Sequence, residues 1–149
     1  MDPINSLRKK ILISGKELRI LVSGNSMEPV IHDADSITIK YCDKYAVGDI
    51  IVYEYKDTIL VHRILKKRHN LYFCKGDNCF RIEEVEDRSI LGKVVAINNQ
   101  EVARHSQILL KMSLYVGWRF RVTQSISRTC QSHIYRCYKY CILRKYLER

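Results

Sequence analysis

A serine in a short polar stretch is the first residue that could do chemistry. Ser26 lies in "SGNSMEPVI", residues 23–31, directly after the strand-like run "RILV". A serine hydroxyl attacks a carbonyl at neutral pH only when a base takes its proton and donors stabilise the oxyanion. Gly24 permits a sharp backbone path, and Pro29 stiffens the exit of the loop. Ser26 is therefore either a turn residue or a nucleophile that needs a base from elsewhere.

Of the five histidines, His62 best suits the role of that base. In "ILVHRIL" the alternation of a strand places His62 on the same face as Leu60 and Ile64, toward apolar surroundings. On this fact alone, a core histidine with one satisfied nitrogen is the plainer interpretation. The other histidines lie in polar turns or in the basic C-terminal segment: His32, His69, His105 and His133.

A carboxylate follows in "KGDN", residues 75–78, after the strand-like run "LYFC". Aspartate is common in turns because its side chain bonds nearby backbone groups, so Asp77 alone is unremarkable. A catalytic histidine, however, needs a carboxylate to hold its tautomer and to stabilise the imidazolium. Ser26, His62 and Asp77 occur in this order, each at the edge of a predicted strand.

Five blocks in register resemble the signal peptidase I superfamily, particularly the type of the endoplasmic reticulum, archaea and some spore-forming bacteria. They run from about Leu21 to Ile97 and read "GNSMEP", "VGDIIVYE", "VHRIL", "KGDN" and "ILGKVVAI". Bacterial general signal peptidases and LexA-type repressors use lysine as the base, whereas the endoplasmic-reticulum type has histidine. The "VHR" of this chain matches the histidine version.

The resemblance implies a serine endopeptidase that cleaves leader or signal peptides. Ser26 would be the nucleophile, His62 the general base and Asp77 the orienting acid. It also implies a coiled, mostly antiparallel β domain whose groove receives an extended peptide as an added strand.

Two departures from the family pattern bear on these roles. Relatives often carry Ser-Gly before the nucleophile, where this chain has Gly24 and Asn25, so Asn25 is the substitute for a side-chain oxyanion donor. The family also has a second acidic position beyond "KGDN", where this chain reads "CFRIEEVED". Glu83 and Asp87 are therefore alternatives to Asp77 as the carboxylate that orients the base.

The elements that must position these residues form three predicted regions. Residues 1–19 have helical spacing with Gly15 as a stop, and residues 20–103 contain short runs rich in Val, Ile, Tyr and Phe. Residues 104–149 return to helical spacing and predict a pair of basic amphipathic helices. The predicted fold class is thus mainly β, a coiled antiparallel catalytic domain with a short N-terminal helix and a helical tail.

The tail carries most of the net charge of +10, since Glu148 is its only acidic residue. Such a tail could meet an anionic membrane surface or a transporter, and nucleic acid is the less favoured partner. No segment approaches the roughly 20 apolar residues of a membrane span, and no secretory signal is evident. The chain is therefore expected in the cytoplasm, with peripheral attachment to the inner face of the cell membrane as a further option.

No cofactor or metal is expected. The six cysteines are predicted to be reduced thiols because no export signal accompanies them, although Cys74 and Cys79 are close enough in sequence to pair. Cys130, His133, Cys137 and Cys141 lie along one helical face, and the outer pair would be roughly 16 Å apart, too far for one zinc ion.

Two other functions share the predicted fold. A peptide-binding β domain with a vestigial Ser-His-Asp set would retain affinity without turnover. A LexA-like self-cleaving regulator would need a DNA-binding domain, and the roughly 20 residues before Leu21 cannot hold a helix-turn-helix.

Overall fold

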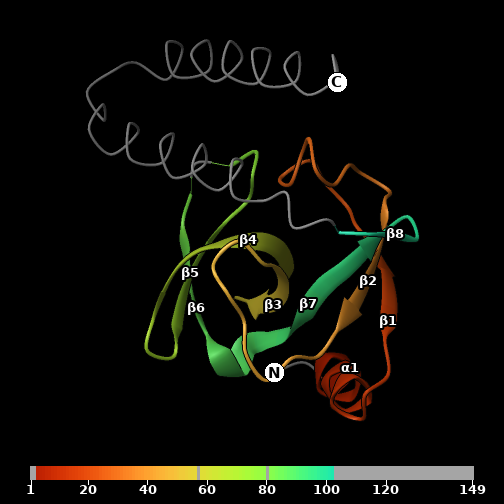
Figure 1. Ribbon diagram of the computed structural model, residues 1–149, viewed down its shortest axis with the longest axis vertical. Coiled ribbons are helices and arrows are strands. Elements are labelled where there is room, and N and C mark those ends of the chain that lie inside the picture. Colours follow the sequence, from red (N-terminus) through yellow and green to blue (C-terminus); the bar gives the residue numbers. More distant parts are fainter. Residues whose placement is uncertain (1–2, 57, 80, 103–149) are drawn as a thin grey trace.

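The computed structural model describes residues 3–56, 58–79 and 81–102. One helix precedes a series of short strands and a single 3-10 turn (Figure 1). The elements are α1 (Pro3–Ile13), β1 (Leu18–Leu21), β2 (Ser36–Lys40), β3 (Ile50–Tyr55), β4 (Thr58–Arg68), β5 (Leu71–Lys75), β6 (Glu83–Glu86), η1 (Asp87–Ser89), β7 (Ile90–Ile97) and β8 (Gln100–Glu101).

The strands form one antiparallel sheet in the order β1-β2-β7-β3-β4-β5-β6, with β8 added to β7. The sheet is strongly coiled, and α1 packs against β7 and β1 (Figure 1). Shifts of register in β2, β3 and β4 help the sheet to bend, because a β-bulge increases local twist. The prediction of a mainly β, antiparallel fold with a short N-terminal helix is confirmed.

The first four side chains of β3 are buried on both faces of the sheet, which explains the apolar run "IIVY" at its start. Ile50 and Val52 belong to one hydrophobic cluster with Leu12 of α1. Ile51 and Tyr53 point the other way, into a second cluster. Because alternate residues of a strand face opposite sides, β3 divides two cores, and the neighbouring β4 presents its side chains to the same two sides.

The predicted helix at residues 1–19 is shorter in the structure, where α1 ends at Ile13 and β1 begins at Leu18. Gly15 lies between them with a φ of 84°, a left-handed conformation that glycine adopts readily and that ends the helix. The predicted basic helices at residues 104–149 lie outside the described residues, and the three-part division of the chain stays a prediction. Within the described ranges, no helix has the length and apolar character needed to cross a membrane.

Candidate active site

The loop that carries Ser26 joins β1 to β2 and is anchored at both sides of the serine. Gly24 has a φ of 101°, and its N–H donates to Asp33 Oδ1 at 2.7 Å. On the other side, Met27 and Ile31 are buried in the first hydrophobic cluster. Ser26 lies between these anchors and is half-buried, so the fold holds it next to the first hydrophobic cluster and still partly open to solvent.

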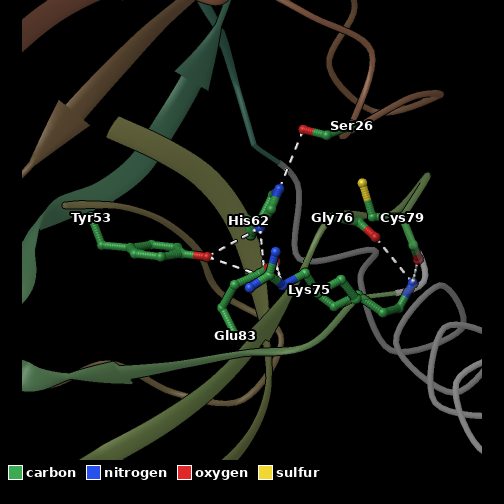
Figure 2. Close-up of polar contacts among 8 residues, drawn as sticks. Ser26, Tyr53, His62, Lys75, Gly76, Cys79 and Glu83 are labelled. Carbon is green, nitrogen blue, oxygen red and sulfur yellow. Dashed lines mark hydrogen bonds and ion pairs between the residues drawn. The ribbon is translucent and has the colours of Figure 1, made fainter. Parts of the chain in front are cut away.

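His62 of β4 lies directly opposite Ile51 of β3 and is 4% exposed. Its Nε2 is 3.3 Å from Ser26 Oγ, and its Nδ1 is 3.0 Å from Glu83 Oε2 (Figure 2). The imidazole therefore bridges a hydroxyl and a carboxylate from elements far apart in the sequence. This is the spatial order of a nucleophile, a base and an orienting acid.

Asp77, the carboxylate favoured from the sequence, pairs with Arg63 instead of facing His62 Nδ1. Arg63 Nε donates to Asp77 Oδ1 at 2.9 Å, and Arg63 Nη2 donates to Asp77 Oδ2 at 2.6 Å. Asp87, the third candidate, accepts a hydrogen bond from the Tyr72 hydroxyl at 3.1 Å. The carboxylate in contact with His62 Nδ1 is thus that of Glu83, one of the two alternatives to Asp77.

Strand register explains this exchange of carboxylates. Ile64 pairs with Cys74, and Cys74 pairs with Glu83, so Glu83 shares a face of the sheet with Ile64 and His62. Arg63 pairs with Lys75 on the opposite face. Asp77 lies two residues beyond Lys75 and thus meets Arg63.

The turn after β5 holds the Ser26 loop from the opposite side. The Asn78 N–H donates to the Ser26 carbonyl at 2.7 Å, and Asn78 Nδ2 donates to the Asn25 carbonyl at 2.8 Å. A Cβ added at Gly76 would lie 2.5 Å from the Ser26 carbonyl oxygen and 3.0 Å from His62 Nε2. The turn can approach this closely only because residue 76 is glycine.

Lys75 holds this turn in place through hydrogen bonds to its backbone. Its side chain is buried, and its ammonium donates to the carbonyls of Gly76 at 3.0 Å and Cys79 at 2.7 Å (Figure 2). Burial lowers the pKa of Lys75, because a charged ammonium loses its hydration there. The carbonyl acceptors and the nearby Asp77 charge act against this cost.

Sequence reasoning did not single out Tyr53 or Arg63, and both are buried next to the site. The Tyr53 hydroxyl is 3.1 Å from His62 Nδ1 and 3.4 Å from Glu83 Oε2 (Figure 2). Arg63 also donates to the Gly48 carbonyl at 3.0 Å. Both residues lie in the blocks "VGDIIVYE" and "VHRIL", but only the pairing of β3 with β4 shows that they lie next to the site.

Within the described ranges, no three potential metal ligands come together. The cysteines there, Cys42, Cys74 and Cys79, are free thiols. Burial raises the pKa of Cys74 to about 12 and also raises that of Cys79, so both thiols favour their neutral form. The groups in direct contact at this site are the Ser26 hydroxyl, the His62 imidazole and the Glu83 carboxylate.

Two comparisons with known proteins indicate the family of this chain. Residues 5–95 match the model of the family described as Peptidase S24-like. The chain is also 36% identical over 89 residues to the protein named signal peptidase complex catalytic subunit SEC11 of Lodderomyces elongisporus, an alignment that covers 55% of this chain and 51% of the relative. The chain thus spans about half the length of that curated relative. The family match covers more than half of the chain, which therefore belongs to the Peptidase S24-like family, with likeness to a signal peptidase catalytic subunit.

Proposed function

We propose that this protein is a serine endopeptidase of the signal peptidase type, in which Ser26 is the nucleophile, His62 the general base and Glu83 the carboxylate that orients the base. The observation that carries the proposal is the position of the His62 ring, with Nε2 3.3 Å from Ser26 Oγ and Nδ1 3.0 Å from Glu83 Oε2. The Ser26 contact is slightly long for a hydrogen bond. Catalytic contacts often tighten only when substrate binds.

The proposed reaction proceeds through an acyl-enzyme. Ser26 Oγ attacks the scissile carbonyl carbon while its proton passes to His62 Nε2, and Glu83 stabilises the imidazolium through Nδ1–H. His62 then gives this proton to the leaving amine as the C–N bond breaks. A water molecule, deprotonated by His62, attacks the ester and releases the second product and free Ser26.

Oxyanion stabilisation falls to groups of the Ser26 loop. A backbone N–H beside the nucleophile is a common donor in such sites. Gly24 has no side chain to offer, so we assign any side-chain donor to Asn25, whose backbone carbonyl is fixed by Asn78 Nδ2 at 2.8 Å.

The proposed substrate is an extended peptide, and by likeness to the named relative a leader or signal peptide. Among the described residues β1 lies at one end of the sheet order, and its outer side is the edge at which we place an added strand. Leu21 is 76% exposed there, and the Ser26 loop follows directly. An added peptide would present its backbone close to the serine.

The test is mass spectrometry of a library of leader-like peptides after incubation with the protein. Ser26→Ala should abolish cleavage, and His62→Ala should lower kcat by about 10²–10⁴, the usual contribution of a general base. Cleavage at the wild-type rate by Ser26→Ala protein would refute the mechanism. Peptide binding by both wild-type and Ser26→Ala protein without turnover would instead indicate a binding module.

A further inference from the structure

Tyr53 has a hydroxyl that packing alone does not require. The side chain lies in β3 and is 0% exposed within the second hydrophobic cluster. Its hydroxyl is 3.1 Å from His62 Nδ1 and 3.4 Å from Glu83 Oε2, so it completes a triangle with the two groups (Figure 2). Burying a hydroxyl is costly unless it is hydrogen-bonded, whereas phenylalanine would fill the same volume without that cost.

With Glu83 ionised, only one arrangement of the protons shared by these three groups satisfies the triangle. A carboxylate can only accept, so the 3.0 Å contact between Glu83 Oε2 and His62 Nδ1 requires a proton on Nδ1. With Nδ1 protonated, the Tyr53 hydroxyl cannot donate to it, and its hydrogen is left with Glu83 Oε2. If Tyr53 instead donated to an unprotonated Nδ1, that nitrogen and Glu83 Oε2 would face each other as two acceptors.

The phenol stays a donor in this environment. Burial, and then the Glu83 charge, raise the pKa of Tyr53 well above its ordinary value, so the hydroxyl keeps its proton. A proton on Nδ1 leaves Nε2 of the neutral imidazole as the acceptor that faces Ser26 Oγ.

We propose that Tyr53 is a positioning residue, which donates to Glu83, holds that carboxylate against His62 Nδ1 and so fixes the tautomer in which His62 Nε2 can accept the Ser26 proton. The effect of Tyr53 on catalysis rests on the proposed peptidase function, whereas its effect on the His62 tautomer does not.

The structure supplies a matched comparison within the described residues. Tyr72 of β5 is also buried in the second cluster, and its hydroxyl donates to the Asp87 carboxylate at 3.1 Å. Tyr53→Phe and Tyr72→Phe therefore each remove one hydrogen bond from a buried tyrosine to a carboxylate, which is buried for Glu83 and exposed for Asp87. Only the first removes a bond that touches His62.

The experiment measures the histidine ring by two-bond ¹H–¹⁵N NMR in the full chain, with His62 assigned by its loss in His62→Ala. We expect wild-type and Tyr72→Phe proteins to show a single Nδ1–H tautomer, and Tyr53→Phe to show a mixture of the two. With a cleaved peptide, Tyr53→Phe should lower kcat roughly tenfold, the effect of one lost hydrogen bond to a charged group, and leave KM unchanged.

A double-mutant cycle separates positioning from packing. Tyr53→Phe should have no further effect on kcat or tautomer in a Glu83→Gln background, because its action passes through that carboxylate. In the unsubstituted protein, the Tyr53 hydroxyl proton should exchange slowly and show a nuclear Overhauser effect to the His62 Nδ1 proton, a measurement that needs no folded variant.

Three results would overturn the proposal: an unchanged His62 tautomer in Tyr53→Phe, an equal effect of Tyr72→Phe on it, or an unprotonated Nδ1 in the wild type. An unchanged kcat in an active Tyr53→Phe enzyme would do the same. If no protein cleaves any peptide, the peptidase function fails, and the NMR comparison still decides whether Tyr53 sets the tautomer.

Discussion

Two consecutive residues of β4 each bind a buried carboxylate, and the two contacts differ in kind. On one face of the sheet, His62 meets Glu83 and leaves Nε2 directed at Ser26. On the other face, Arg63 is 2% exposed and donates to Asp77 through two nitrogens and to the Gly48 carbonyl through a third. The two basic side chains differ in their ability to exchange protons. The His62 imidazole can accept and release a proton near neutral pH, whereas the Arg63 guanidinium stays protonated.

The two carboxylates differ in what they hold in place. The Arg63–Asp77 pair ties β4 to the turn after β5, and Asn78 of that turn holds the backbone of the Ser26 loop. This pair therefore helps to fix the Ser26 loop relative to β4, whereas Glu83 contacts the His62 ring itself. Asp77, bound to Arg63, can stabilise the turn, but orienting an imidazole requires a carboxylate that contacts the ring, as Glu83 does.

The largest expected effect is on turnover, from Glu83→Gln. An amide can donate to Nδ1 and so favours the tautomer with the proton on Nε2, where it blocks acceptance from Ser26. We expect kcat to fall by about 10⁴, as for loss of the equivalent carboxylate in other triads. Kinetics on a cleaved peptide would check this, and a drop below tenfold would mean that Glu83 does not orient the base.

Asp77→Ala should act first on stability. It leaves the Arg63 charge buried and unpaired by Asp77, which costs about 3–5 kcal/mol of unfolding free energy. Urea unfolding and peptide kinetics of the two variants distinguish the two roles. Asp77→Ala should lose more unfolding free energy than Glu83→Gln, and Glu83→Gln should lose more kcat than Asp77→Ala. The reverse order would contradict a structural role for Asp77 and a catalytic role for Glu83.

The smallest of these three expected effects comes from Gly76→Ala, in the turn that contacts both Ser26 and His62. The new Cβ would displace the Ser26 carbonyl, 2.5 Å away, and so shift the nucleophile relative to His62. A displacement near 1 Å costs roughly 10²-fold in rate, so kcat should fall by about that factor.

Gly92→Ala is the control for Gly76→Ala. Its Cβ would lie 2.8 Å from the Lys40 carbonyl, a similar clash on β7 with neither Ser26 nor His62 among the neighbours it would meet. Comparable losses of turnover per folded molecule in both variants would show that crowding near Ser26 has no special effect.

Sequence by itself determined the class of fold and the chemical types at the site. Val, Ile and Tyr runs separated by turn residues favour strands, and "GNSMEP" and "VHRIL" indicated a serine in a loop and a histidine in a strand. Such local patterns depend only on neighbours along the chain, so the sequence reveals them without a structure. The resemblance to the signal peptidase superfamily predicted that Ser26 and His62 lie together, and they are 3.3 Å apart in the structure.

Tertiary structure decided which side chains meet. Asp77 and Glu83 both follow β5 in the sequence, and the resemblance of "KGDN" to the family pattern favoured Asp77. Strand pairing assigns Glu83 to the His62 face and Asp77 to the Arg63 face. Tyr53 reaches the same ring from β3, across another pairing. Because a side chain reverses its face with every residue, a shift of one position in register exchanges the partners, and register is fixed by the packing of the whole sheet.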